Sequence, residues 1–128
     1  MGKCETYCKG YGPYANLVFR LLFGLMFFLH GWGKFASGMP AGTMLVAGII
    51  EVVVGAAVFL GLFTRVAAGL GAVEMLVAYF MAHAGNGWNP LANGGELALL
   101  YFAGFLALAV LGNGKWNLEE ILFKKELF

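Results

Sequence analysis

The sequence has few charged residues and no aspartate. Charged residues make up 12% of the 128-residue chain, about half of the roughly 25% that is usual in soluble globular proteins. Hydrophobic residues make up 61%, more than a domain of this size is able to hide from water. These proportions exclude a soluble globular domain and a disordered chain. The sequence predicts an integral membrane protein with a single domain, residues 1–128.

The chain also lacks a cluster of basic residues, because its eight lysines and arginines are scattered among seven glutamates. Without such a cluster no surface follows a phosphate backbone, so we expect the lipid bilayer, and no nucleic acid, as a partner. The two cysteines, Cys4 and Cys8, have a C-x3-C spacing. This spacing matches neither the redox motif C-x-x-C nor a zinc pair, so we expect reduced thiols and no bound metal.

Four windows are long and apolar enough to be membrane helices, at about residues 15–33, 43–62, 66–84 and 95–111. The connections are short and rich in Gly, Pro and Asn, which favours turns. The expected fold is all-α: a four-helix up-down bundle in the membrane. The apolar stretch of the first window is too long and begins too late for a signal peptide, so we expect it to be retained.

Lysine and arginine in short loops predict the orientation of the bundle. With four spans, both termini lie on the same side as the turn after the second span. That side carries all the basic residues outside the spans except Lys34: Lys3, Lys9, Arg65, Lys115, Lys124 and Lys125. We therefore expect a protein of the cytoplasmic membrane with both termini cytoplasmic.

The segment after the last span predicts a short helix at the membrane surface. Asn117 is placed to cap this helix, with Glu120 as its partner three residues later. The apolar residues of the segment share one face: Leu118, Ile121, Leu122 and Phe128. The alternative is a frayed tail.

Glu51 and Glu74 lie near the middle of the second and third spans. A charge at mid-bilayer costs at least about 3 kcal/mol, so such residues are candidates for function. Small residues surround each glutamate at helical spacing: Ala47, Gly48 and Gly55 around Glu51, and Ala67, Gly71, Ala78 and Ala82 around Glu74. Small residues mark the faces where membrane helices pack closely, so both carboxyls are expected to point into the bundle.

The first span offers cations for these carboxyls at the two ends of a second small-residue face. Depth along the helix predicts a structural ion pair between Arg20 and Glu74, and places Lys34 near Glu96. No cation is evident at the depth of Glu51, so we expect this side chain to be protonated or to bind a ligand. The alternative is that these charges only hold the bundle together.

His30 and His83 lie near the outer ends of their spans. Two histidines at one level are able to ligate a haem or a metal. His83, however, lies about 180° around its helix from Glu74 and is expected to face away from the bundle. Because histidines beside tryptophans such as Trp32 and Trp88 are usually interfacial, we expect neither haem nor metal.

Several short motifs together resemble the DoxX family of small four-span membrane proteins. These motifs occur in order over nearly the whole chain after the first dozen residues: Arg20 followed by His30-Gly31-x-Gly33-Lys34, then Glu51-x3-Gly55, Leu60-Gly-Leu-Phe-Thr-Arg65-x-Ala67-Ala68, Asn93-Gly-Gly-Glu96-x-Ala98 and Gly112-x-Gly114-Lys-Trp116-Asn-Leu118-Glu119. The resemblance implies a four-helix membrane bundle. It also implies a link to membrane oxidoreductases, such as thiosulfate:quinone oxidoreductases and redox-defence complexes.

The first functional hypothesis is a quinone-linked membrane subunit of a redox system with a redox-partner protein. In this hypothesis Glu51 and Glu96 are catalytic, and His30, Lys34, Glu51 and Glu96 bind the ligand near the outer leaflet. The second hypothesis is a non-catalytic scaffold or small-solute carrier that anchors a partner. Small-residue faces such as Ala68 and Ala72 also suggest a homo-oligomer.

Overall fold

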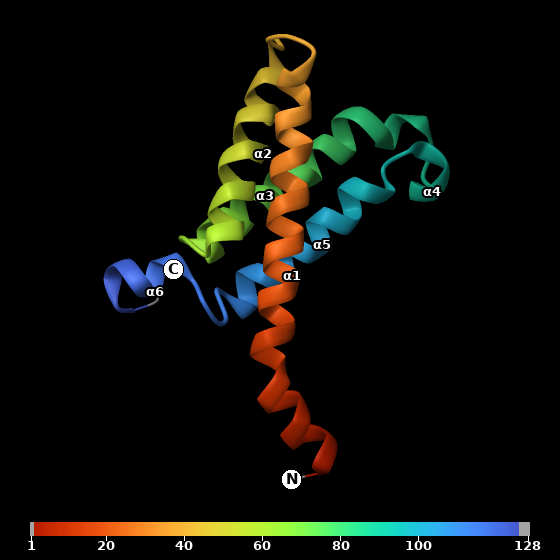
Figure 1. Cartoon of the computed structure of the whole chain (residues 1–128). Coiled ribbons are helices and arrows are strands. Elements are labelled where there is room, and N and C mark those ends of the chain that lie inside the picture. Colours follow the sequence, from red (N-terminus) through yellow and green to blue (C-terminus); the bar gives the residue numbers. More distant parts are fainter. Residues whose placement is uncertain (1, 126–128) are drawn as a thin grey trace.

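The computed structural model describes residues 2–125, and this part of the chain is helical and contains no strand. In chain order its elements are α1 (Lys3–Ala36), α2 (Thr43–Leu60), α3 (Thr64–Ala78), the π-helical η1 (Tyr79–His83), the 3-10 helix η2 (Ala84–Asn86), α4 (Pro90–Asn93), α5 (Glu96–Leu111) and α6 (Leu118–Phe123). Figure 1 shows their arrangement. The expected all-α class is confirmed.

Three helical segments are long and apolar enough to cross a membrane: Lys3–Ala36, Thr43–Leu60 and Thr64–Asn86. The fourth predicted span corresponds to α5, which is apolar but has only 16 residues. At 1.5 Å per residue α5 is about 24 Å long, somewhat shorter than a hydrocarbon core of about 30 Å. The structure therefore has three to four apolar helices that are able to span a membrane.

The long helices form two antiparallel pairs, α1 with α2 and α3 with α5. The pairs cross and then diverge, so that the far ends of α3 and α5 lie away from α1 and α2 (Figure 1). The four-helix up-down bundle that the sequence predicts is not confirmed, because the two pairs are splayed.

The α1–α2 pair is held by the small-residue face predicted for the first span. A methyl group added to Gly24 would lie 2.9 Å from the carbonyl oxygen of Gly55, and one added to Gly31 would lie 2.6 Å from Cβ of Glu51. The two backbones thus approach as closely as glycine permits. This close approach places Glu51 directly against the C-terminal half of α1.

The core between the two pairs is made of apolar side chains from all four long helices. Phe27 of α1 and Phe105 of α5 are fully buried, with their ring centroids 4.7 Å apart. Ala68 and Ala72 of α3 belong to this core, with exposed fractions of 0% and 4%. The expectation of a homo-oligomer through these alanines therefore loses its basis, because the face that carries them packs inside the protomer.

The cap predicted for the C-terminal helix is confirmed. The Asn117 side-chain oxygen accepts a hydrogen bond from the Glu120 backbone N–H at 2.7 Å, and its amide donates to the Glu120 carboxyl at 3.2 Å. Ile121 and Leu122 of α6 are largely exposed. Phe128 lies outside the described residues, and the position of α6 at a membrane surface stays a prediction.

Candidate functional site

A cavity of about 1130 Å³ lies where the two helix pairs diverge. Side chains from α1, α2, α3, η1 and α5 line it, and most of them are apolar, such as Ile50, Leu70 and Val73. Six titratable residues also line the cavity: His30, Lys34, Glu51, Glu74, His83 and Tyr101. A large apolar cavity with a few convergent polar groups is the usual form of a small-molecule site.

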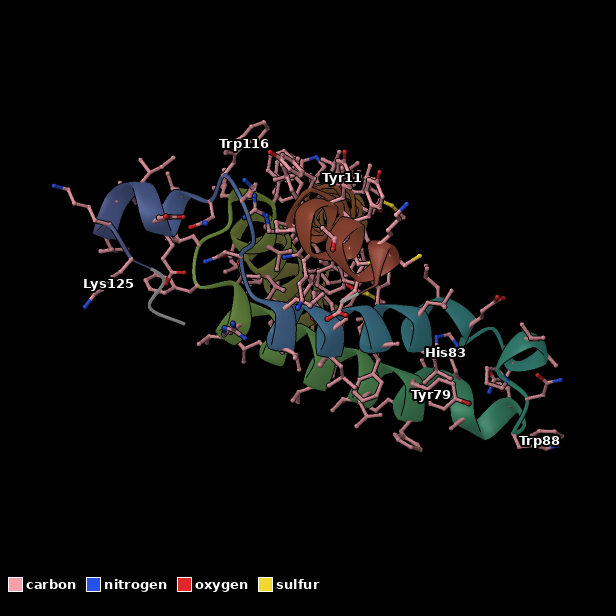
Figure 2. All side chains as sticks on the ribbon, turned by 90° about the horizontal axis from the view of Figure 1, so that it is seen from below. Tyr11, Tyr79, His83, Trp88, Trp116 and Lys125 are labelled. Atoms are coloured by element: carbon pink, nitrogen blue, oxygen red, sulfur yellow. The ribbon has the colours of Figure 1, made fainter. Side chains whose placement is uncertain are left out.

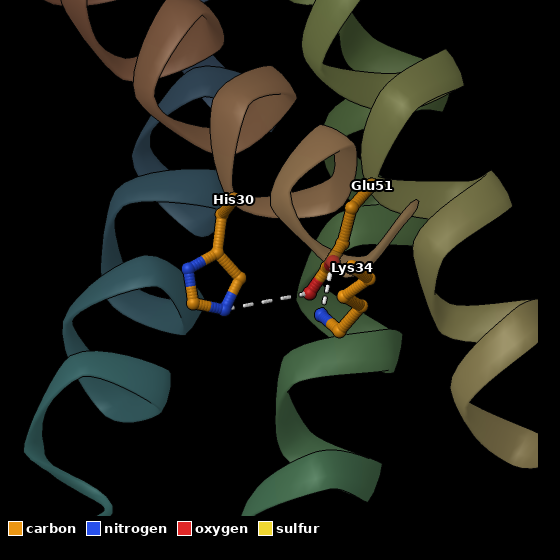
Figure 3. A network of polar contacts seen from close by, with 3 residues as sticks. All are labelled: His30, Lys34 and Glu51. Atoms are coloured by element: carbon orange, nitrogen blue, oxygen red, sulfur yellow. Dashed lines mark hydrogen bonds and ion pairs between the residues drawn. The ribbon is translucent and has the colours of Figure 1, made fainter. Parts of the chain in front are cut away.

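Three of these residues form a polar cluster on the α1–α2 side of the cavity (Figure 3). Glu51 has only 2% of its side chain exposed and forms an ion pair with the ammonium group of Lys34. The Nε2 atom of His30 lies 3.9 Å from the other oxygen of the same carboxylate. His30 and Lys34 are one helical turn apart on α1, so both reach the same partner on α2.

The prediction that no cation lies at the depth of Glu51 is wrong. Lys34 was assigned to the depth of its own Cα, but side chains on a helix tilt towards the helix N-terminus. A lysine also has a long flexible stem, which carries its charge away from its backbone. The Lys34 ammonium group therefore reaches Glu51 and forms its ion pair there instead of with Glu96.

Glu96 does not join this cluster. It is the first residue of α5 and is exposed, whereas the next residues of the same helix, Leu97 and Ala98, line the cavity. The predicted grouping of Glu96 with Lys34 is wrong, because Glu96 itself is exposed and Lys34 pairs with Glu51.

The predicted ion pair between Arg20 and Glu74 is also wrong. Arg20 is buried, and its guanidinium donates to the backbone carbonyls of Asn113 at 2.9 Å and Trp116 at 2.7 Å. These carbonyls follow the C-terminal end of α5, where a cation is favoured by the partial negative charge of the helix end. Arg20 thus fixes the C-terminal segment instead of neutralising Glu74.

Glu74 lines the cavity from α3, and both of its carboxyl oxygens are buried without a hydrogen-bond partner. Glu51 and Lys34 are close enough to interact with it electrostatically. The expectation that Glu74 points into the protein is confirmed. No described residue takes the place of Arg20 as its hydrogen-bond partner.

His83 lines the cavity as well, contrary to the prediction that it faces away. That prediction assumed an α-helix from Glu74 onwards, but the segment from Tyr79 to His83 is π-helical. A π-helix has more residues per turn than an α-helix, so it rotates His83 back towards the cavity. The His83 ring lies beside Tyr79, with the ring centroids 6.4 Å apart (Figure 2).

A buried polar cluster that the sequence did not predict lies at the opposite end of the protein. Thr64 donates a hydrogen bond to the side-chain oxygen of Asn113, and the Asn113 amide donates to the Glu119 carboxyl. The Glu119 backbone N–H donates to the carbonyl of Gly61 at 3.1 Å. These bonds tie the segment after α5 to the α2–α3 turn. The sequence signal for this cluster was the presence of Asn113 and Glu119 directly after an apolar span, since a frayed tail has no use for polar side chains at fixed positions.

The fold and the cavity define a small helical membrane protein with a ligand-sized cavity between its two helix pairs. The model of the DoxX family matches residues 15–84, more than half of the chain. The chain belongs to the DoxX family, as its motifs suggested.

Curated relatives agree with this assignment. An uncharacterized protein of Haemophilus influenzae is 44% identical over 90% of this chain and 96% of its own length. The inner membrane protein YqjF of Escherichia coli is 30% identical over 85% of this chain and 92% of its own. A Bacillus subtilis protein named "Putative oxidoreductase CatD" is 28% identical over 86% of this chain and 88% of its own length. No solved structure matches the chain at a significant level.

Proposed function

We propose that this protein is a membrane subunit of a redox system and that its cavity binds a quinone. The observation that carries the proposal is the composition of the cavity. Its walls are mostly apolar, and His30, Lys34 and Glu51 form a polar cluster on one side. The relative named as an oxidoreductase supports the redox class.

The residues present fit a quinone. A quinone head has carbonyl oxygens that accept hydrogen bonds, and the Lys34 ammonium and the His30 ring are donors at the cavity wall. An isoprenoid tail is apolar and suits the walls formed by residues such as Leu70, Val73 and Val77. The cavity volume of about 1130 Å³ leaves room for the head and part of a tail.

Glu51 is placed to handle protons. When bound, the quinone supplies the electron-accepting chemistry, and the two electrons come from a redox-partner protein. Glu51 is held against Lys34 and His30, so a proton is able to pass between the carboxylate and its neighbours without leaving the cavity. Positioned proton transfer of this kind contributes about 10²–10⁴-fold to a rate.

The test compares wild type with Glu51→Gln. The substitution keeps the side-chain shape and removes the group that takes up a proton and passes it on to the reduced quinone, so we expect it to slow protein-dependent quinol formation by about 10²-fold or more. Quinol is measured with electrons supplied by a reduced mediator, after subtraction of the reaction without protein. The matched control is Glu5→Gln, an exposed site at the far end of α1, which we expect to leave the rate unchanged.

Mass analysis of ligands extracted from the protein in mild detergent provides the independent check. A quinone at near-stoichiometric amount supports the proposal. If Glu51→Gln forms quinol as fast as wild type, the proposed proton path is wrong. A protein that neither retains nor binds quinone contradicts the proposed function itself.

One observation favours a second candidate, a scaffold that anchors a soluble partner. The first part of α1, residues 3–12, is exposed throughout and extends beyond the other long helices (Figure 1). A helix that stands free of its own fold offers a surface to another protein. This candidate predicts normal partner binding in Glu51→Gln, whereas the redox proposal requires a functional loss in that variant.

We further propose that both termini are cytoplasmic. Hydrogen bonds join Arg20 of α1, the α2–α3 turn and the C-terminal segment at one end of the protein, and the basic residues outside the spans concentrate at that end. A membrane-impermeant maleimide should label the exposed Cys4 and Cys8 only after spheroplasts are opened.

The control for this orientation uses Trp88→Cys in a background without Cys4 and Cys8. Trp88 is 90% exposed and lies in the connection between η2 and α4, so its replacement should be labelled in intact spheroplasts. Labelling of Cys4 and Cys8 in intact spheroplasts would reverse the proposed orientation.

A further inference from the structure

Glu74 is a buried titratable group for which the proposed proton path has no role. Its two carboxyl oxygens are shielded from solvent and accept no hydrogen bond from the described residues. Glu74 nevertheless lines the same cavity as the Glu51 cluster and lies on a different helix, α3 instead of α2. The two carboxyls thus belong to opposite helix pairs.

The two carboxyls differ in their partners. Lys34 forms its ion pair with Glu51, which compensates one negative charge. A second negative charge on Glu74 would be buried without a donor and would be repelled by Glu51. An unpaired buried carboxylate costs several kcal/mol, which the side chain avoids by keeping its proton.

A neutral carboxylic acid has one O–H donor. No described residue accepts a hydrogen bond from Glu74 in the conformation that the structure shows. A buried donor without an acceptor is itself unfavourable. A ligand in the cavity that Glu74 lines is able to supply the missing acceptor.

We infer that Glu74 is held as a neutral acid and donates a hydrogen bond to the second carbonyl of the quinone. Lys34 and His30 donate to the first carbonyl from the opposite helix pair. This inference rests on the proposed function, and it specifies the ligand as a neutral head group with acceptors on two opposite sides. Glu74 lines the cavity while its oxygens are shielded, so its side chain rotates on binding to present the O–H to the ligand.

The experiment uses the full-length protein in nanodiscs and a benzoquinone with a short alkyl tail as the probe. Affinity is measured by quenching of tryptophan fluorescence. Glu74→Leu removes the donor and should weaken binding about tenfold, the effect of one hydrogen bond. Glu74→Gln retains an N–H donor and should bind within about threefold of wild type.

An infrared measurement supplies a readout that does not depend on the quinone. A protonated carboxyl has its own C=O absorption, which we expect in wild type and in Glu51→Gln and not in Glu74→Gln. Because Glu74→Leu replaces an unpartnered polar group by an apolar one, we expect its melting temperature to be no lower than that of wild type.

The outcomes separate this inference from the proposed function. If wild type binds the probe and Glu74→Leu binds it equally well, the inference is overturned and the proposed function stands. Persistence of the carboxyl band in Glu74→Gln also overturns the inference. If wild type does not bind the probe, the proposed function is contradicted, and so is the contact between Glu74 and the quinone.

Discussion

Replacing Lys34 by methionine is expected to destabilise the protein by about 3 kcal/mol, because Glu51 then remains buried without its cation. Methionine keeps most of the volume of the lysine stem, so the effect reports the charge and not a lost packing contact. Glu51 has 2% of its side chain exposed, and water is therefore unable to replace the ammonium group. The free energy of unfolding is measured by denaturant titration in mild detergent.

The double variant Lys34→Met/Glu51→Gln is the matched control. It removes both charges, and replacing a whole buried pair is far less costly than breaking it. We expect the double variant to be more stable than Lys34→Met alone, which makes the two substitutions strongly non-additive. Equal stabilities of the single and double variants would show that the ion pair does not form.

Replacing Arg20 by leucine is expected to cost about 3–5 kcal/mol, because two charge-assisted hydrogen bonds are lost and two carbonyls, one of them buried, lose their donor. These carbonyls belong to Asn113 and Trp116, so the loss should appear first in the segment after α5. Hydrogen exchange in the segment 112–119 should accelerate more than in the core of α5.

Two variants define the specificity of this effect. Arg20→Lys keeps the charge but lacks the forked guanidinium that reaches two carbonyls. Its stability should therefore lie between those of Arg20→Leu and wild type. Arg65→Gln affects an exposed arginine that donates to Ala109 and Val110, and we expect a change below about 1 kcal/mol. Unchanged exchange in the segment 112–119 of Arg20→Leu would contradict the role given to Arg20.

Hydropathy and small-residue spacing were sufficient to predict the long helices. Each of the four apolar windows corresponds to one long helical segment, because a membrane helix is specified by local composition. The packing face through Gly24 and Gly31 was predictable from the sequence for a similar reason, because close helix packing requires small residues at fixed intervals. The Asn117 cap is likewise a local signal.

The partners of the charged residues were not predictable in the same way. Helix depth placed Arg20 beside Glu74 and Lys34 beside Glu96, but long side chains reach a full turn from their Cα atoms. The splay of the two helix pairs moved Glu96 away from Lys34, and no local pattern encodes such an angle. His83 was misplaced because a single π-helical turn shifts the helical phase without changing the hydropathy.

The length of α1 has a consequence for where its two ends lie. Its 34 residues make a rod about 51 Å long, against a hydrocarbon core of about 30 Å. The rod carries Lys34 near one end and the exposed Cys4 and Cys8 near the other. Because α1 is about 20 Å longer than that core, the part that carries Cys4 and Cys8 extends out of the bilayer while the part that carries Lys34 lies at the cavity.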